Sequence, residues 1–211
     1  MKTDDLINML STNAGRAPAR LAEQRLGTAA LAGVLAAAAF SVAWLGLIPP
    51  ELFSEGAPWL KLAYGFAVVL ASGLWLIRLG RPAASDREPR MLLLGVVLFM
   101  VLLAGISFLA TPVDLRTHAV QGHSWSSCPW SIIKLSMPAL GAGIWAMRGL
   151  APTQTGWAGF ATGLFAGAAG SIGYALACDE TATPFIAIWY TLGMLGSGVV
   201  GALVAPRFYR W

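Results

Sequence analysis

Charged residues are scarce in this 211-residue chain, and their scarcity decides its class. Asp, Glu, Lys and Arg together make up 11% of the residues, whereas hydrophobic residues make up 57% and the mean hydropathy is +0.67. Soluble domains carry about 25% charged residues. The composition therefore excludes an ordinary soluble domain and predicts a membrane protein.

The usual signatures of catalysis and ligand binding are also missing from the sequence. It has no phosphate-cradling glycine loop, no His-Glu-x-x-His pair and no Cys-x-x-Cys motif. It offers no carboxylate pair, no nucleophile beside a base and no acidic residue in the middle of an apolar run. The net charge of +4 is dispersed between apolar runs, which argues against nucleic-acid binding. We expect a non-enzymatic protein that requires no cofactor.

Six apolar windows are each long enough to cross a bilayer as an α-helix. They cover residues 27–48, 59–79, 91–110, 130–147, 157–177 and 184–204. The fourth window is the weakest, because it contains Lys134 and Pro138. The predicted fold is all-α: a polytopic transmembrane domain of six helices over residues 27–205, between an N-terminal segment of residues 1–26 and a short tail of residues 206–211.

The placement of Lys and Arg predicts the orientation of these helices. With the N-terminus inside, only Lys61, Arg116 and Lys134 of the fourteen basic residues fall on the outer side. Six spans then place both termini in the cytoplasm. The first apolar run begins after 26 residues and is longer than a signal-peptide core, so we expect it to be retained as a span.

Both cysteines and both histidines fall in outer loops of this topology. His118, His123 and Cys128 belong to the polar stretch THAVQGHSWSSCPW, and Cys178 belongs to ALACDETATP. Counted from the short inner connection between the fourth and fifth spans, the two thiols lie about 30 Å and about 33 Å along their helices. Their depths are thus nearly equal, and converging helix ends would bring them together.

Three interpretations of the cysteine pair stay open at this point. Cys128 and Cys178 could form a structural disulfide, be two unrelated small buried residues, or act as a pair that responds to redox state or binds a soft metal ion. His118 and His123 are possible accessory ligands for such an ion. Solvated loop histidines are, however, the commoner case.

The opening residues MKTDDLINML predict a short helix with one apolar side. Thr3 is a suitable N-cap, and Asp4 and Asp5 suit the positive end of the helix dipole. The apolar side chains are those of Leu6, Ile7, Met9 and Leu10. A helix this short is marginal in water, so we expect it to order on docking to a cytoplasmic protein; a frayed terminus is the alternative.

Small residues recur at four-residue spacing in the last two windows. The fifth window contains Gly159, Gly163 and Gly167, and the sixth contains Gly193, Ser197 and Gly201. Such faces allow helix backbones to approach closely. They predict either packing within the bundle or oligomerisation.

Four segments of the chain resemble the NrsF-type membrane anti-sigma factors, which are negative regulators of an extracytoplasmic-function sigma factor. These segments are MKTDDLINML, GHSWSSCPW, RGLAPT and ALACDETATPFIAIWYTLGML, and the resemblance runs the full length. It implies a bacterial inner-membrane protein with six spans and a cytoplasmic N-terminus that holds the sigma factor. It also implies that Cys128 and Cys178, on the periplasmic side, respond to heavy metals or oxidants, and that the segment from Asp4 to Leu10 binds the sigma factor.

Rival functions remain beside this expectation. A transporter for a metal or small oxyanion would need polar residues within the spans. A membrane thiol oxidoreductase would need a second cysteine pair or a quinone site besides Cys128 and Cys178. In a purely structural helical bundle the two cysteines would only form a disulfide that joins two helices.

Overall fold

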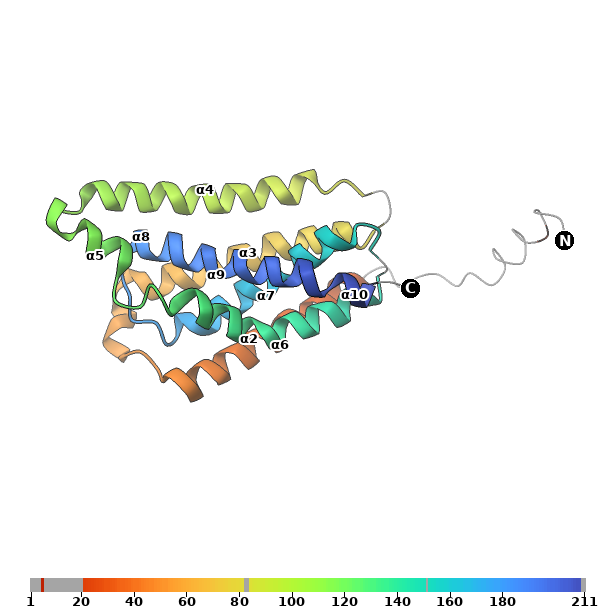
Figure 1. Ribbon diagram of the computed structural model, residues 1–211, viewed down its shortest axis with the longest axis horizontal. Coiled ribbons are helices and arrows are strands. Elements are labelled where there is room, and N and C mark those ends of the chain that lie inside the picture. The colour runs from red at the N-terminus through yellow and green to blue at the C-terminus, as the bar shows by residue number, and fades with distance from the viewer. Residues whose placement is uncertain (1–4, 6–20, 82–83, 151, 210–211) are drawn as a thin grey trace.

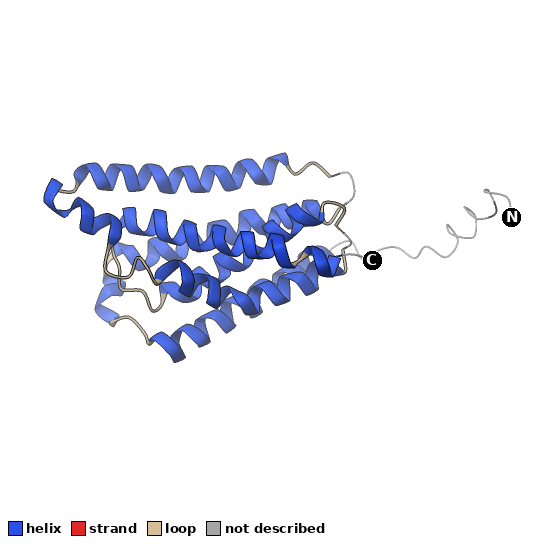
Figure 2. Ribbon diagram, viewed as in Figure 1, coloured by secondary structure: helices blue, strands red, loops and turns tan. Residues whose placement is uncertain are grey.

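The computed structural model describes Asp5 and residues 21–81, 84–150 and 152–209, and these residues form helices and loops without a strand. The long helical segments run side by side along the long axis of the molecule (Figure 1), and loops and short helices connect them (Figure 2). The predicted all-α class is confirmed for the described residues.

The six long segments follow one another in an up-and-down order. In chain order they are α2 (Leu21–Leu45), α3 (Gly56–Leu79), α4 (Arg87–Ala110), α6 (Cys128–Arg148), α7 (Thr155–Ala175) and a last segment made of α8 (Thr183–Phe185), the π-helix η3 (Ile186–Tyr190) and α9 (Thr191–Val204). The shorter helices are η1 (Pro50–Ser54), η2 (Val113–Leu115), α5 (Arg116–Gln121) and α10 (Pro206–Tyr209). The start of α2 and α10 lie at one end of the bundle, the terminal end, and α5 lies at the opposite end, the cysteine end (Figure 1).

Four of the long segments are long and apolar enough to cross a membrane. They are Ala22–Leu45, Gly56–Leu79, Arg87–Ala110 and Thr183–Val204, and they overlap the predicted spans 27–48, 59–79, 91–110 and 184–204. The helices α6 and α7 have 21 residues each and overlap the predicted spans 130–147 and 157–177, but neither is among the four helices that qualify as candidate spans by length and hydropathy. As membrane spans, these two stay predictions.

The helix α7 forms the centre of the bundle and packs against α2, α3, α6 and α9. Every residue from Ala161 to Ala175 is buried. Glycine makes this possible, because a Cβ at Gly163 would overlap the backbone carbonyl of Ser197 in α9, and a Cβ at Gly201 would overlap that of Gly159. Most small residues of the last two windows therefore serve packing between α7 and α9, whereas Gly193 faces Ile132 of α6.

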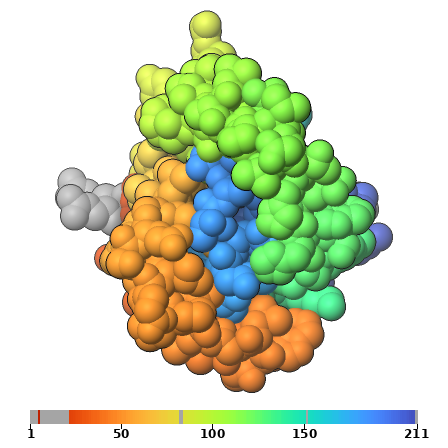
Figure 3. Space-filling view, turned by 90° about the vertical axis from the view of Figure 1, so that its left-hand side faces the viewer, coloured from red at the N-terminus to blue at the C-terminus, as the bar shows by residue number. Residues whose placement is uncertain are grey.

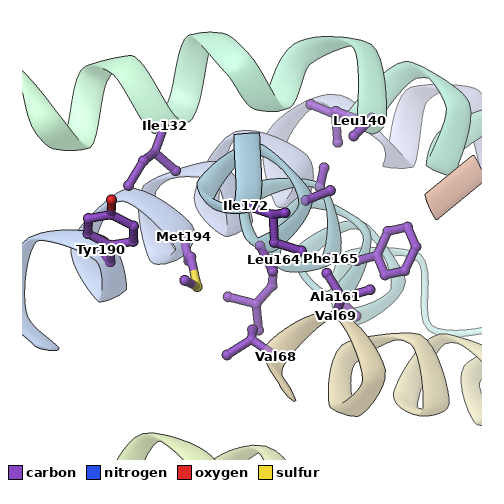
Figure 4. Packing of buried hydrophobic residues seen from close by; sticks show 14 of the residues in the cluster. Val68, Val69, Ile132, Leu140, Ala161, Leu164, Phe165, Ile172, Tyr190 and Met194 are labelled. Atoms are coloured by element: carbon purple, nitrogen blue, oxygen red, sulfur yellow. The ribbon is translucent and has the colours of Figure 1, made fainter. Parts of the chain in front are cut away.

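Larger apolar side chains surround this central helix. Figure 4 shows side chains of α3, α6 and α9, such as Val68, Ile132 and Met194, gathered around Leu164 and Ile172 of α7. In a bilayer these groups leave lipid rather than water on folding, so close van der Waals packing is what they contribute.

The helix α4 lies at the edge of the bundle. Only Pro89, Met100 and Ala104 among its residues are buried. Two cavities with almost wholly apolar walls, of about 360 and about 530 Å³, lie alongside it. A helix with such an exposed apolar surface is suited to contact with lipid rather than water.

Candidate functional site

The two cysteines lie buried at the cysteine end of the bundle. Cys128 is the first residue of α6, and Cys178 follows the end of α7 by three residues. Both are free thiols, with exposed fractions of 0% and 3%, and they are close enough to interact electrostatically. Figure 3 looks onto this end: the connection after α7 (blue) lies at the centre of the face, between the residues that precede α6 (green) and the start of α3 (orange).

A lysine is completely buried beside the thiols. Lys61, in the second turn of α3, has an exposed fraction of 0%, and its Nζ donates a hydrogen bond of 2.6 Å to the carbonyl oxygen of Cys178. The ammonium also acts electrostatically on the Cys128 thiol. Lys61 is thus part of the cysteine site, although the sequence suggested only that it lies on the outer side.

Two tyrosines complete the walls of the site. The rings of Tyr174 and Tyr190 lie 5.8 Å apart between their centres, and both side chains adjoin the two thiols. Tyr174 is one helical turn before Cys178, whose amide donates to its carbonyl oxygen at 3.0 Å. Tyr190 ends the π-helix η3, and its buried hydroxyl has no hydrogen-bond partner within the described part of the chain. Such π-helical turns are frequent at functional sites.

A buried carboxylate fastens the loop before Cys128 to the segment after Cys178. The Oε1 atom of Glu180 accepts hydrogen bonds from the amides of His123 (2.7 Å) and Ser124 (3.1 Å) and from the Ser124 hydroxyl (3.1 Å). Gly122 permits this approach, because its φ of +56° suits glycine and a Cβ there would collide with the Glu180 carboxylate. We call this arrangement of residues 122–124 around Glu180 the Glu180 clamp.

The predicted accessory ligands face solvent rather than the thiols. The His123 ring is 63% exposed and lies 3.3 Å from Asp179 and 3.1 Å from Glu180. His118, on α5, is exposed. Within the described residues no group of three or more His, Cys, Asp and Glu side chains could hold a metal ion. A metal-binding role for the two thiols therefore stays a prediction, and so does any help from the histidines.

The terminal end contains the start of α2, the first long helix after the N-terminal segment. The structure describes one of the predicted sigma-binding residues, Asp5, which is helical and exposed. The others lie outside the described residues: Asp4, Leu6, Ile7, Met9 and Leu10. Glu23, in the first turn of α2, forms an ion pair of 2.5 Å with Arg81, which follows the end of α3.

Some partners of the cysteines could have been suspected from the sequence and others could not. Lys61 is a charge inside an apolar window, which is a recognised sign of a functional or paired residue in a membrane helix. Glu180 and Tyr190 carry no comparable signal. Their importance comes from contacts with Ser124 and Cys178 that only the folded chain establishes.

The chain matches known proteins along its whole length. The family described as negative regulator of sigma F (NrsF) matches residues 10–211. A protein of Caulobacter vibrioides (strain NA1000 / CB15N) named anti-sigma-F factor NrsF is 38% identical over 216 residues, with 100% of both chains covered. A protein of Azospira oryzae (strain ATCC BAA-33 / DSM 13638 / PS) named probable anti-sigma-F factor NrsF is 37% identical over 214 residues, again with 100% of both chains covered. No solved structure matches. These similarities show that the chain belongs to the family of negative regulators of sigma F.

Proposed function

We propose that the protein is an anti-sigma factor of the bacterial inner membrane that holds an extracytoplasmic-function sigma factor and releases it under heavy-metal or oxidant stress. The observation that carries the proposal is the separation of two features in a member of this family. The buried thiol pair lies at one end of a helical bundle, and α2, the first long helix after the N-terminal segment, begins at the other end.

The proposed topology has six membrane spans with both termini in the cytoplasm. Four long apolar helices and the mostly exposed, apolar surface of α4 support a membrane location. The basic residues support the orientation, because among those that the structure describes only Lys61, Arg116 and Lys134 belong to the cysteine half of the bundle. The thiols then lie on the periplasmic side, where oxidation and metal binding are possible.

The proposed sigma-binding element is the N-terminal segment, with the apolar side chains of Leu6, Ile7, Met9 and Leu10 against the partner. A short segment that orders on docking can be released by a modest loss of affinity, since each tenfold change corresponds to about 1.4 kcal/mol. The protein itself need not bind nucleic acid, because its partner, the sigma factor, is the species that recognises DNA.

The proposed signal is a change at Cys128 and Cys178. Two thiols that bind a soft ion such as Cd²⁺ release two protons, and two thiols that form a disulfide pass two electrons and two protons to an oxidant. Either product would fix the spacing of the two sulfur atoms and so constrain the start of α6 relative to the end of α7. The ion is the signal here and not a resident cofactor.

The test is a pull-down in detergent that compares the full-length protein with a variant lacking residues 2–14. We expect the full-length protein to retain a sigma factor, the truncated variant to lose it, and cadmium to release it from the former. A Cys128→Ser/Cys178→Ser variant should retain the sigma factor in the presence of cadmium. Absence of any sigma factor from folded, abundant full-length protein would refute the proposal. Metal uptake into vesicles or quinone reduction would instead favour the transporter or the oxidoreductase.

A further inference from the structure

The burial of Lys61 needs an explanation, because it is costly. Removing an ammonium group from water costs several kcal/mol even after the protein relaxes, and an apolar residue of similar size often gives an equally stable or more stable fold. Lys61 forms no ion pair among the residues that the structure describes, and its one hydrogen bond goes to the Cys178 carbonyl. A residue retained at this cost points to a role beyond stability.

The cysteine end of α3 is attached to the segments on both sides of Cys178. Lys61 holds the Cys178 carbonyl just after α7, and Tyr64, one turn further along α3, shares a hydrogen bond of 2.7 Å with Thr191. The Thr191 hydroxyl donates its own proton to the Ala187 carbonyl at 2.5 Å, so Tyr64 is the donor in that bond. Thr191 directly follows Tyr190, which adjoins the thiols. A displacement of either segment therefore pulls on α3.

The other end of α3 reaches the base of the N-terminal segment. Arg81 lies about 30 Å from Lys61 along the helix, at 1.5 Å per residue. It is bound to the last turn through its amide, which donates to the Arg78 carbonyl at 3.1 Å. Its guanidinium pairs with Glu23 at 2.5 Å, in the first turn of α2, which directly follows residues 1–20 of the N-terminal segment.

We propose that Lys61 is a third component of the sensing site, a positioning residue that couples the cysteine pair to α3 and, through the Arg81–Glu23 pair, to the base of the N-terminal segment. This inference rests on the proposed function for its biological meaning, but its physical content can be measured without the sigma factor. A change at Cys178 moves the carbonyl that Lys61 holds, and α3 carries the displacement to the start of α2.

The experiment compares the full-length protein with its Lys61→Met variant in detergent, with and without CdCl₂. Hydrogen–deuterium exchange is followed in peptides covering residues 21–30 and 76–81. We expect cadmium to change exchange in both peptides of the unmodified protein and in neither peptide of the variant. Thermal unfolding should show that Lys61→Met is at least as stable, which separates coupling from a structural role.

Two further variants sharpen the result. Lys134→Met removes an exposed lysine that stacks on Trp44, and it should respond to cadmium like the unmodified protein. Glu23→Gln should keep the response at residues 76–81 and lose it at residues 21–30. An unchanged cadmium response in Lys61→Met would overturn the inference, and so would an unmodified protein whose terminal end does not respond to cadmium.

Sigma retention then links the coupling to function. Cadmium is expected to weaken retention by at least about tenfold in the unmodified protein and by less than about twofold in Lys61→Met. If neither protein retains a sigma factor although the exchange response depends on Lys61, the proposed function fails and the coupling stands. Equal release from both proteins would overturn the coupling while leaving the proposed function intact.

Discussion

The helices α4 and α7 are similar in length but opposite in surroundings. In α4, 11% of the most apolar window is buried, and its large exposed apolar side chains are Leu, Ile, Val, Phe and Met. In α7 every residue from Ala161 to Ala175 is buried, and the sequence is largely Gly and Ala. Side chains on α4 are suited to lipid, whereas those on α7 are suited to close contact with other helices. High hydropathy therefore marks the periphery of this bundle, and small size marks its centre.

The largest difference between the two helices is expected when one methyl group is added to each by a Gly→Ala substitution. Gly163→Ala in α7 would place a Cβ against the backbone of Ser197, which cannot move without displacing α9. We expect a loss of about 2–3 kcal/mol in unfolding free energy. The matched change, Gly105→Ala in α4, meets nothing within 4 Å and should be neutral or stabilising by up to about 1 kcal/mol. Thermal unfolding in detergent measures both, and equal effects would contradict the contrast.

A second pair of variants separates the two faces of α4 itself. Met100 is 2% exposed and Leu98 is 59% exposed. Met100→Ala should cost about 2 kcal/mol, because it opens space between α3 and α4, whereas Leu98→Ala should cost less than about 0.5 kcal/mol. Chemical denaturation of the two purified variants checks this. A larger loss for Leu98→Ala would mean that a further surface covers the outer face of α4.

The polar contacts next to the two helices should also contribute differently to the free energy of unfolding, but by a smaller amount. Glu180, just beyond α7, is buried and accepts three hydrogen bonds, so Glu180→Gln should cost about 1–2 kcal/mol. It should also speed the reaction of the buried Cys128 with a maleimide, because the clamp ties the loop before Cys128 to the segment after Cys178. Glu88, at the start of α4, pairs with Arg78 at 3.1 Å while 79% exposed, and Glu88→Gln should change stability by less than about 0.5 kcal/mol. Unfolding curves and labelling rates together decide whether the clamp holds the site closed.

The sequence predicted the helix boundaries well wherever a long apolar run defines the helix. The window 91–110 lies within α4, and the window 59–79 ends where α3 ends, because long apolar runs leave little ambiguity. The window 27–48 is displaced from α2, which begins at Leu21 and ends at Leu45. Hydropathy does not detect the helical but charged first turn around Glu23, nor the turn at Gly46, whose φ is +83°.

The cysteine site was only half predictable. Composition and topology bring Cys128 and Cys178 to one end of the bundle, and helical rise predicts similar depths. The contact of Lys61 with Cys178 spans 117 positions in the sequence, and local patterns carry no information about it. The π-helical turn that ends at Tyr190 likewise depends on packing, since its residues Ile186–Tyr190 read as ordinary apolar helix.

The burial of both thiols sets a time scale for any reaction they undergo. A metal ion or oxidant can reach buried thiols only while a local opening exposes them, so the rate of modification saturates once the reagent outpaces that opening. A sensor built in this way ignores a brief pulse, however concentrated, and registers a weaker exposure that persists. Such a site would respond to the duration of exposure more than to its peak concentration. A looser Glu180 clamp would make the thiols react faster but also with brief exposures.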